Sequence, residues 1–239
     1  MIITVEYYVI VKGVESWNDY YASIDDDLVG IALLLALREL ITETQTHITS
    51  YEELKTFLQD TDEDPNNPDN IILFYCGISI DSDWSYTWNR EHVWPQSLGW
   101  FSESGAGADL HHLRPTDPSV NSSRGNKRFG EVEHGYEVKI SITNGGGGSG
   151  CYANTEFFEP RDEVKGDVAR IIFYLFTRYP QSDAYDFEDV AESLELLLEW
   201  HTIDPVDEFE SHRNDVIAEY QGNRNPYIDN PEYAYLIWS

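Results

Sequence analysis

Basic residues are scarce in this chain. Its 239 residues include 15 Lys and Arg against 44 Asp and Glu, which gives a formal net charge of −29. A surface with that excess repels nucleic acids and other polyanions at long range, so the composition alone argues against nucleic-acid binding. It also fits a protein adapted to concentrated salt, where screening shortens the repulsion to about 3 Å at 1 M. An activity optimum at low salt would count against such an adaptation.

Cysteines and long apolar runs are lacking too. Cys76 and Cys151 make neither a disulfide framework nor a metal motif, and the sequence leaves open whether they pair. No apolar run reaches 18 residues, so we expect no membrane span. The longest apolar stretch, 31–37, follows three aspartates, and segment 1–10 has no basic leader. We therefore expect no signal peptide in this chain.

Aromatic residues, in contrast, are abundant, with 7 Trp, 16 Tyr and 10 Phe, and hydrophobic residues make up 41% of the chain. This is enough apolar material for a folded core, where we expect most of the aromatic rings. No internal repeat or domain break is visible, so we expect a single domain over 1–239 and a monomer. Two polar or glycine-rich stretches, 60–70 and 144–150, are expected to be surface loops.

The N-terminal half is expected to combine helices with short strands. Residues 27–44 are apolar on nearly all sides of a helix, which predicts a buried helix. Ser50 and Glu53 make a capping-box pattern ahead of a second helix, 51–59. Two strands are expected, at 71–76 and 136–142.

The C-terminal third is expected to be helical. Apolar residues recur at helical spacing over 168–179 and again over 187–198. Asp204 and Pro205 resemble the N-cap and first residue of a third helix that ends near Tyr220. The fold class that follows is α+β, with a mainly helical shell around a small centre that contains little sheet.

Positive charge is concentrated between residues 90 and 128. This window contains five of the 15 basic residues, only four of the 44 acids, and three of the seven histidines. The basic residues and histidines of this window are Arg90, Arg114, Arg124, Lys127, Arg128, His92, His111 and His112. A locally basic groove in an acidic protein can still bind phosphate by contact. Chance clustering or internal ion pairing is the alternative.

The residue types in this window suit phosphodiester hydrolysis, which needs a base, a cation and donors that hold the phosphate in line. Histidine titrates near neutral pH, at about 6.5, so His92 can act as the base. Mg²⁺ prefers oxygen ligands, which the carboxylate of Glu91 and the carboxamide of Asn121 supply. The arginines that can bind the phosphate are Arg114, Arg124 and Arg128.

Local structure brings some of these residues together. Asp117 can cap and Pro118 can open a short helix, which would place Asn121, Arg124 and Arg128 on one face.

The neighbours Glu91 and His92 present a geometric difficulty, because adjacent residues of a regular strand point to opposite faces. Both reach one site where the strand bends or ends, and Pro95 makes such an ending plausible.

Four segments, in this order, resemble the endonuclease I family of the histidine–metal (ββα-metal) finger nuclease superfamily. They are WNREHVWPQS, DLHHLRPTD with VNSSRGN, FEPRDEVKGDVARIIFY, and RNDVIAEYQGNRNPYID. The resemblance runs from about residue 70 to residue 233. Four separate segments in the same order are more specific than a single short motif.

The resemblance implies that His92 is the general base and that Glu91 and Asn121 hold one Mg²⁺ ion, or Ca²⁺ or Mn²⁺ in its place. The implied reaction is sequence-nonspecific cleavage of DNA, RNA or both, leaving 5′-phosphate ends. We assign Arg124 to catalysis beside His92. The residues that we assign to substrate binding are Arg90, Arg114, Arg128, His111 and His112.

The resemblance also implies how the single nuclease domain is organised. Its parts are an N-terminal helical part over 1–70, the ββα-metal finger over 71–142, and C-terminal helices over 143–239. Family members that act outside the cell favour a secreted or periplasmic location. Residues 221–229 are expected to form a rigid turn that supports the finger.

Two other functions stay open. A zinc hydrolase could use Asp109 with His92, His111 and His112, although neighbouring residues cannot easily share one ion. A non-enzymatic acidic binding module would keep its function when His92 is replaced by alanine. Purely structural roles are equally open for His111 and His112, and internal ion pairs are open for the arginines.

Overall fold

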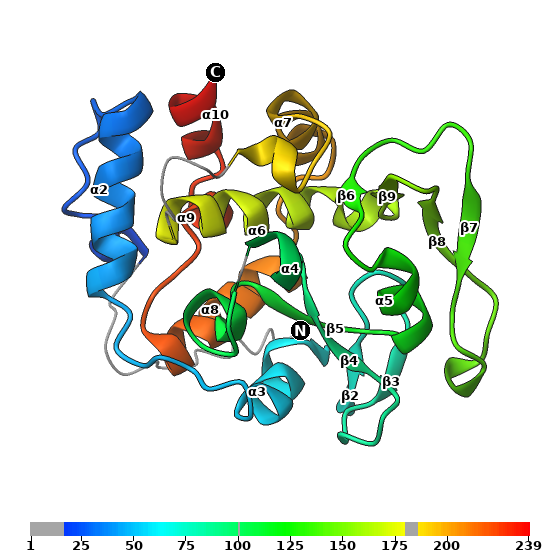
Figure 1. The fold of residues 1–239 in the computed structure, drawn as a ribbon. Helices are drawn as coiled ribbons and strands as arrows, with labels where there is room; N and C mark the ends of the chain where they lie inside the picture. The colour runs from blue at the N-terminus through cyan, green and yellow to red at the C-terminus, as the bar shows by residue number, and fades with distance from the viewer. Residues whose placement is uncertain (1–16, 100, 180–185) are drawn as a thin grey trace, which may run out of the picture.

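A long central helix, α6 (Lys165–Arg178), organises the fold (Figure 1). The computed structural model describes residues 17–99, 101–179 and 186–239. The apolar face predicted from the helical spacing is buried, with Val168, Ile171, Ile172 and Leu175 all in the core. The expected helix over 168–179 is therefore confirmed.

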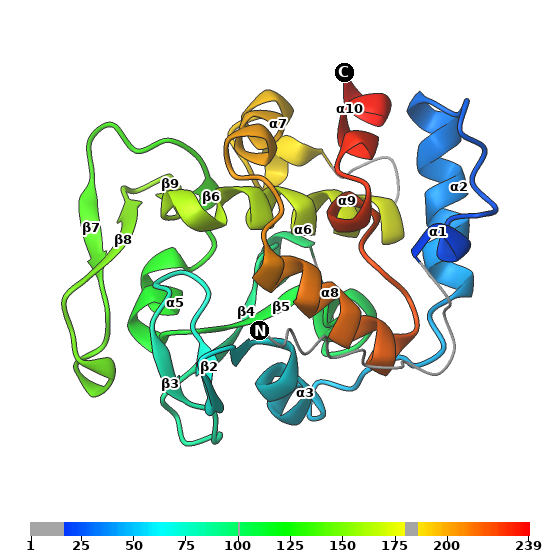
Figure 2. The ribbon, with the colours of Figure 1, turned by 180° about the vertical axis from the view of Figure 1, so that it is seen from behind.

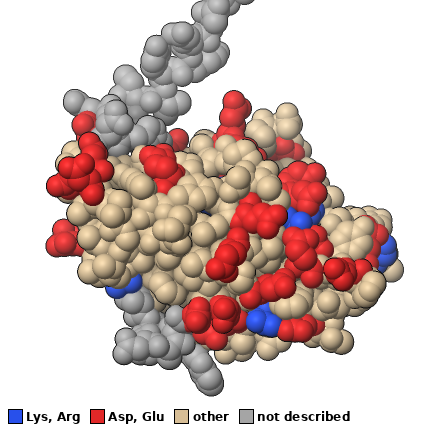
Figure 3. Space-filling model, turned by 90° about the horizontal axis from the view of Figure 1, so that it is seen from above, with Lys and Arg blue, Asp and Glu red and all other residues tan. Residues whose placement is uncertain are grey.

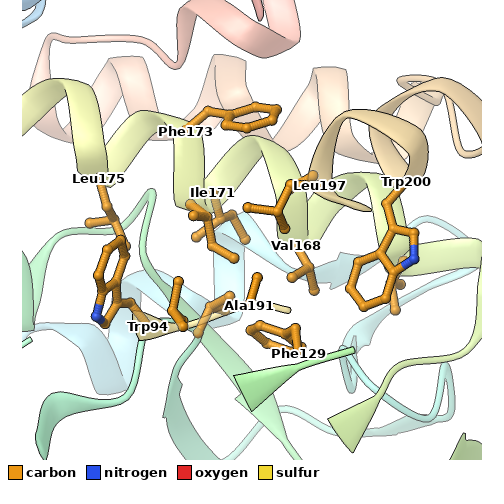
Figure 4. Close-up of a cluster of buried hydrophobic side chains, with 14 of the residues drawn as sticks. Trp94, Phe129, Val168, Ile171, Phe173, Leu175, Ala191, Leu197 and Trp200 are labelled. Carbon is orange, nitrogen blue, oxygen red and sulfur yellow. The ribbon is translucent and has the colours of Figure 1, made fainter. Parts of the chain in front are cut away.

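The largest hydrophobic cluster lies around α6. Figure 4 shows Trp94, Phe129, Leu197 and Trp200 gathered around side chains of α6, with Leu197 and Trp200 coming from α7 (Leu194–Ile203). A buried aromatic side chain removes a large apolar area from water, and burial stabilises the fold by about 25 cal/mol per Å². The abundant aromatic residues thus lie largely in the core, as the composition predicted.

Other helices surround α6 (Figures 1 and 2). They are α1 (Trp17–Tyr20), α2 (Gly30–Glu43), α3 (Leu54–Thr61), α4 (Gln96–Gly99), α5 (Pro118–Arg124), α8 (Glu208–Gln221), α9 (Pro226–Asp229) and α10 (Glu232–Trp238). Short 3-10 helices are η1 (Gly105–Ala108), η2 (Ile142–Asn144), η3 (Asp162–Val164) and η5 (Phe187–Asp189). None of the helices in the described ranges is long and apolar enough to cross a membrane.

The strands form small sheets. One sheet has the order β1-β2-β3, a second is the pair β4-β5, and a third has the order β6-β9-β8-β7. Their bounds are β1 (Glu63–Asp64), β2 (Asn67–Ile72), β3 (Ser79–Asp81), β4 (Asn89–His92), β5 (Leu113–Thr116), β6 (Arg128–Phe129), β7 (Tyr136–Lys139), β8 (Gly148–Ala153) and β9 (Phe157–Glu159). The predicted fold class, α+β with a mainly helical shell and little sheet, is confirmed.

Two expectations about strands and loops were wrong. Residues 60–70 are not a plain loop, because β1 pairs with β2 there in an antiparallel hairpin. The strand expected over 71–76 ends at Ile72, and a tight turn closes with a hydrogen bond from Gly77 N to Leu73 O. Apolar periodicity predicted the burial of this segment but could not separate a strand from a buried turn.

The helix boundaries also shift. The reciprocal Ser50–Glu53 hydrogen bonds of the predicted capping box are present, but the helix begins only at Leu54. Residues 187–198 are split between η5 and α7. The cap of α8 is Asp207, whose side chain accepts a bond from Glu210 N, and not Asp204.

Helix α2 is less buried than its composition suggested. Leu33, Leu37 and Ile41 face the core, whereas Ile31 is 69% and Leu35 50% exposed.

The glycine-rich stretch 144–150 forms the connection between β7 and β8 and the beginning of β8. The strand expected over 136–142 stops at Lys139. The expectation about segment 1–10 lies outside the described residues.

Charge is divided between the inside and the outside of the protein. Figure 3 shows one face on which Asp and Glu side chains are widespread and Lys and Arg are few. Several basic side chains are instead buried, namely Arg114, Arg124, Lys165, Arg170, Arg213 and Arg224. Each of them contacts carboxylates.

Both cysteines are free, Cys76 partly exposed and Cys151 buried.

Candidate active site

The predicted ββα unit is formed by β4, β5 and α5. The two strands pair antiparallel, with Glu91 opposite Arg114 and His92 opposite Leu113. Helix α5 follows β5 after a single residue, Asp117, and packs against β4. The chain thus brings the segment with Glu91 and His92 next to the helix that carries Asn121 and Arg124.

Asp117 fixes the start of α5. Its buried carboxylate accepts hydrogen bonds from Ser119 N (2.8 Å) and Val120 N (3.2 Å), as an N-cap does. It also accepts bonds from the backbone N and Oγ of Ser141 (3.0 and 2.7 Å) and from Asn144 Nδ2 (2.7 Å). The cap therefore joins α5 to the segment after β7. The helix ends at Arg124, so Arg128 lies on β6 and not on the face of α5 that we expected.

Glu91 points from β4 into the interior. Its Oε1 accepts a hydrogen bond from Tyr75 Oη (2.9 Å) and lies 3.4 Å from Arg124 Nε. Burial raises the pKa of Glu91 to about 7, although Arg124 and the bond from Tyr75 act in the opposite direction. Within the described ranges, Oε2 accepts no hydrogen bond. This oxygen is the one available to a cation.

His92 leaves β4 on the face opposite to that of Glu91, by the alternation of the strand. It is also the last residue of β4, so the strand ends where the sequence required an ending for both residues to reach one site. Its Nε2 lies 3.0 Å from the carbonyl oxygen of Gly107, on η1. A carbonyl oxygen can only accept, so Nε2 carries the proton and Nδ1 keeps its lone pair. Burial lowers the pKa of His92 to about 4, which keeps the imidazole neutral at pH 7. A neutral ring with a free Nδ1 can accept a proton.

Asn121 and Glu91 supply donor types that suit a hard cation, from two elements that pack against each other. The side chain of Asn121 is partly exposed and makes no hydrogen bond in the described part of the chain. A carboxylate oxygen and a carboxamide oxygen are the ligand types that Mg²⁺ takes together with waters. A buried carboxylate whose pKa is raised by burial also gains from a nearby positive charge. The residues therefore fit the implied ion.

Arg124 is completely buried. Its guanidinium donates to the carbonyl oxygens of Val93 and Gly125, lies beside Glu91, and stacks 4.7 Å from the ring centre of Phe129. These contacts hold α5, the end of β4 and the Glu91 carboxylate together. In this position the guanidinium of Arg124 lies next to Glu91 and is not exposed at the surface.

His112 joins the segment after His92 to η1. Its Nδ1 lies 2.6 Å from Ala106 O, and its Nε2 accepts a hydrogen bond from Trp94 N (3.0 Å). These contacts fix the Nδ1–H tautomer. The buried ring also lies edge-on to His92, with the ring centres 5.4 Å apart. The geometry favours the structural role that the sequence left open.

His111 is buried as well. Its Nε2 lies 3.2 Å from Asn223 O, and its ring packs against Tyr174, with the ring centres 4.6 Å apart. No group of three or more His, Cys, Asp and Glu side chains within the described ranges is placed to hold a metal ion. This geometry does not favour the zinc alternative.

The remaining arginines differ in their availability. Arg114 is buried and pairs with Asp62 (2.9 Å) and Asp167 (3.2 Å), the internal ion pairing that the sequence left open. Arg128 is partly exposed and pairs with Glu156. Arg90 is partly exposed, and its guanidinium contacts the ring and the carbonyl oxygen of Tyr51. Arg90 and Arg128 are thus partly exposed but already have partners within the protein.

Residues 221–229 support the site from behind, in agreement with the expectation of a rigid turn. Gln221 Oε1 accepts hydrogen bonds from Leu110 N (2.7 Å) and Thr49 Oγ1 (2.9 Å), and its Nε2 donates to Asp109 Oδ1 (2.9 Å). Gln221 thus anchors the segment that runs from η1 to β5.

Sequence reasoning missed residues that contact the predicted site from distant positions. Tyr75 binds Glu91, and Gly107 binds His92. Tyr51 stacks on His92, with the ring centres 5.8 Å apart and the planes at 18°. No sequence pattern predicts these three contacts, because each contact joins segments that are distant in the sequence and meet only in the folded protein.

Comparisons with known proteins identify the family of the chain. The family model described as Endonuclease I matches residues 30–232. An extracellular ribonuclease of Bacillus subtilis strain 168 is 43% identical over 206 residues, covering 79% of this chain and 68% of the relative. An extracellular ribonuclease of Bacillus amyloliquefaciens is 42% identical over 226 residues, covering 87% and 74%. An extracellular deoxyribonuclease of Aeromonas hydrophila is 30% identical over 124 residues, covering 51% and 49%.

Proposed function

Since the chain belongs to the Endonuclease I family and is an endonuclease, we propose that it hydrolyses DNA and RNA without sequence preference, using one Mg²⁺-like ion and His92 as general base. Glu91 and Asn121 hold the ion. The products carry 5′-phosphate ends. Family membership favours this enzymatic role over an acidic binding module.

The orientation of His92 carries the proposal. Nε2–H is engaged by the Gly107 carbonyl, so Nδ1 is the nitrogen that takes a proton from the attacking water. The water oxygen then bonds to phosphorus as the bond from phosphorus to the 3′ oxygen breaks. The proton of the water ends on Nδ1, and the phosphate stays on the 5′ oxygen of the downstream strand. The upstream strand leaves through its 3′ oxygen, which takes up a proton from solvent to become a 3′-hydroxyl.

The other residues position this reaction. Glu91 and Asn121 would ligate the ion, which when bound neutralises charge that grows on the phosphate and the leaving oxygen. Arg124 holds the Glu91 carboxylate from behind. Arg90 and Arg128 supply guanidinium groups that can bind neighbouring phosphates of the strand.

The names of the relatives support nucleic acid as the substrate class. Two relatives are named ribonucleases and a third a deoxyribonuclease, which supports activity on both polymers. The relatives are named extracellular, and one from Aeromonas hydrophila is named periplasmic. We therefore propose that the protein acts outside the cytoplasm.

The proposal is tested by incubating plasmid DNA and structured RNA with the purified protein. Cleavage of both is expected with Mg²⁺, and none is expected with EDTA. The His92→Ala variant should lose cleavage while it keeps the thermal unfolding temperature of the unaltered protein. Cleavage by His92→Ala at the normal rate would refute the assigned base, and cleavage in EDTA would refute the requirement for an ion.

A further inference from the structure

Tyr51 contacts two side chains of β4. Arg90 and His92 are two residues apart on the strand, so their side chains point to the same face. Arg90 Cζ lies 3.6 Å from the centre of the Tyr51 ring. The imidazole of His92 stacks on the same ring, with the ring centres 5.8 Å apart and the planes at 18°. Tyr51 therefore joins the two side chains.

The backbone around Tyr51 is also held. The Arg90 guanidinium donates from Nη1 to the carbonyl oxygen of Tyr51. On either side, Ser50 N donates to Glu53 Oε2 (2.8 Å) and Glu53 N donates to Ser50 Oγ (3.3 Å). This reciprocal pair does not begin a helix at residue 51, because α3 starts at Leu54. It closes a turn that presents Tyr51 to β4.

The imidazole of His92 is left with few ways to move. Gly107 O binds Nε2, the ring of His112 meets His92 edge-on, and Tyr51 covers one face. The hydrogen bond to Gly107 fixes one nitrogen but permits the ring to rotate about the line of that bond. A flat aromatic neighbour opposes this rotation, because rotation would break the parallel stack.

We propose that Tyr51, clamped by Arg90, is a positioning residue that holds the His92 imidazole in the plane in which Nδ1 faces the attacking water. The inference rests on the proposed function, since it gives Tyr51 a role only if His92 is the base. Tyr51 itself touches neither water nor phosphate in this role. Its ring matters, and its hydroxyl does not.

The chain offers matched variants. Tyr51→Phe keeps the ring, whereas Tyr51→Leu removes it and leaves an apolar side chain. Phe57→Leu removes an aromatic ring of α3 that stacks on Tyr220 (4.2 Å between ring centres) and does not contact His92. This control reports the effect of losing an aromatic stack from the same region.

Steady-state cleavage of a fluorescent single-stranded oligonucleotide in Mg²⁺ separates these roles. Tyr51→Leu should lower kcat by about 10–100-fold with KM unchanged, because a small misplacement of a catalytic group costs rate and not binding. Tyr51→Phe should keep the kcat of the unaltered protein. Phe57→Leu should lower the unfolding temperature without lowering kcat.

Nuclear magnetic resonance of the histidine rings in the metal-free protein gives a readout that is independent of activity. The Nε2–H tautomer of His92 is expected in all of these proteins, because Gly107 still binds Nε2. The His92 ring signals should be narrow in the unaltered protein and in Tyr51→Phe, and broadened by exchange between ring orientations in Tyr51→Leu.

The inference is overturned if Tyr51→Leu keeps kcat and the narrow His92 ring signals, or if Tyr51→Phe loses as much activity as Tyr51→Leu. It is also overturned if Phe57→Leu lowers kcat equally. His92→Ala distinguishes the two levels of the argument. If His92→Ala is active, the proposed function fails. If His92→Ala is inactive while Tyr51→Leu is normal, only the role of Tyr51 fails.

Discussion

The orientation of His92 depends on a glycine carbonyl that lies 15 positions further along the chain. The backbone around Gly107 passes so close to its neighbour that a Cβ atom built there would lie 1.7 Å from Ser102 O. Real carbon atoms do not approach a carbonyl oxygen that closely, so only glycine fits this path. The requirement ties the shape of η1 directly to the tautomer of His92.

Gly107→Ala should therefore affect both stability and catalysis. We expect a loss of about 2–3 kcal/mol in the free energy of unfolding. We also expect kcat to fall by about 10–100-fold because the carbonyl moves away from Nε2. Gly166→Ala is the matched control, since its Cβ would lie 1.9 Å from Asp204 O, far along the chain from η1. Denaturant unfolding and cleavage assays of both variants check this. Equal kcat in the two variants would contradict the role given to Gly107.

Single residues also show where sequence reasoning succeeds and where it stops. Motif reasoning predicted that Glu91, His92 and Asn121 meet, and the fold brings their segments together. It assigned Arg114 to phosphate, but this residue pairs internally with Asp62 and Asp167. The sequence shows that a residue is an arginine but does not show whether its side chain is buried or exposed. Ion pairs between positions more than 50 apart follow from the topology alone.

At the scale of the element, the stability of the short helix α5 depends on its N-cap, Asp117. The helix has only seven residues, and isolated helices of that size are not stable in water. Asp117 stabilises it from its first turn and attaches it to Ser141 and Asn144. The position of Asn121 is therefore set by contacts outside α5.

Asp117→Ala should lower the free energy of unfolding by about 2–4 kcal/mol. The loss combines a cap of about 0.5–2 kcal/mol with buried donors left without an acceptor. It should also weaken the response of activity to Mg²⁺, because α5 carries Asn121. Asp207→Ala removes the exposed cap of α8 and should cost only about 1 kcal/mol. Chemical denaturation and Mg²⁺ titration measure both effects. The same small loss in both variants would show that the links to Ser141 and Asn144 contribute nothing.

The elements themselves could be predicted with unequal success. Strong apolar periodicity predicted α6 correctly because packing and local preference agree there. The capping pattern of α5 was also correct. The predicted start of α8 was wrong because two aspartates near Pro205 can serve as its N-cap. The sequence favoured Asp204, whereas the structure uses Asp207. The hairpin of β1 and β2 was missed because its polar turn residues resemble an ordinary loop.

At the scale of the whole molecule, buried neutral histidines make the fold sensitive to acid. Burial lowers the pKa of His111 and His201 to about 4 and that of His112 to about 3. His201 shows the cause most simply. Its Nε2 lies 2.9 Å from Pro231 O, and its Nδ1 faces the Arg170 guanidinium at 3.4 Å. A second proton on this ring would have no acceptor and would face a positive charge.

Each of these folded pKa values lies below the unfolded value of about 6.5, so unfolding takes up protons as the pH falls. The stabilisation is complete above pH 6.5 and is lost progressively from there towards pH 4. For each histidine, the free energy of unfolding should be about 2 kcal/mol lower at pH 5 than at pH 7. His201→Gln keeps a donor and an acceptor without titrating. Between pH 7 and pH 5 it should lose about 2 kcal/mol less than the unaltered protein in denaturant unfolding. Identical losses would contradict this account.

The basic side chains inside the protein and the carboxylates on its surface serve different ends. The buried Arg124, Arg170 and Arg213 join α5, α6 and α8 to their neighbours through buried carboxylates. Figure 3 shows many further Asp and Glu side chains on the surface. The isoelectric point of the enzyme can therefore be redesigned independently of its architecture. Exchanging exposed aspartates and glutamates for lysines should yield a cationic nuclease on the same scaffold, with attraction towards nucleic acids in place of repulsion.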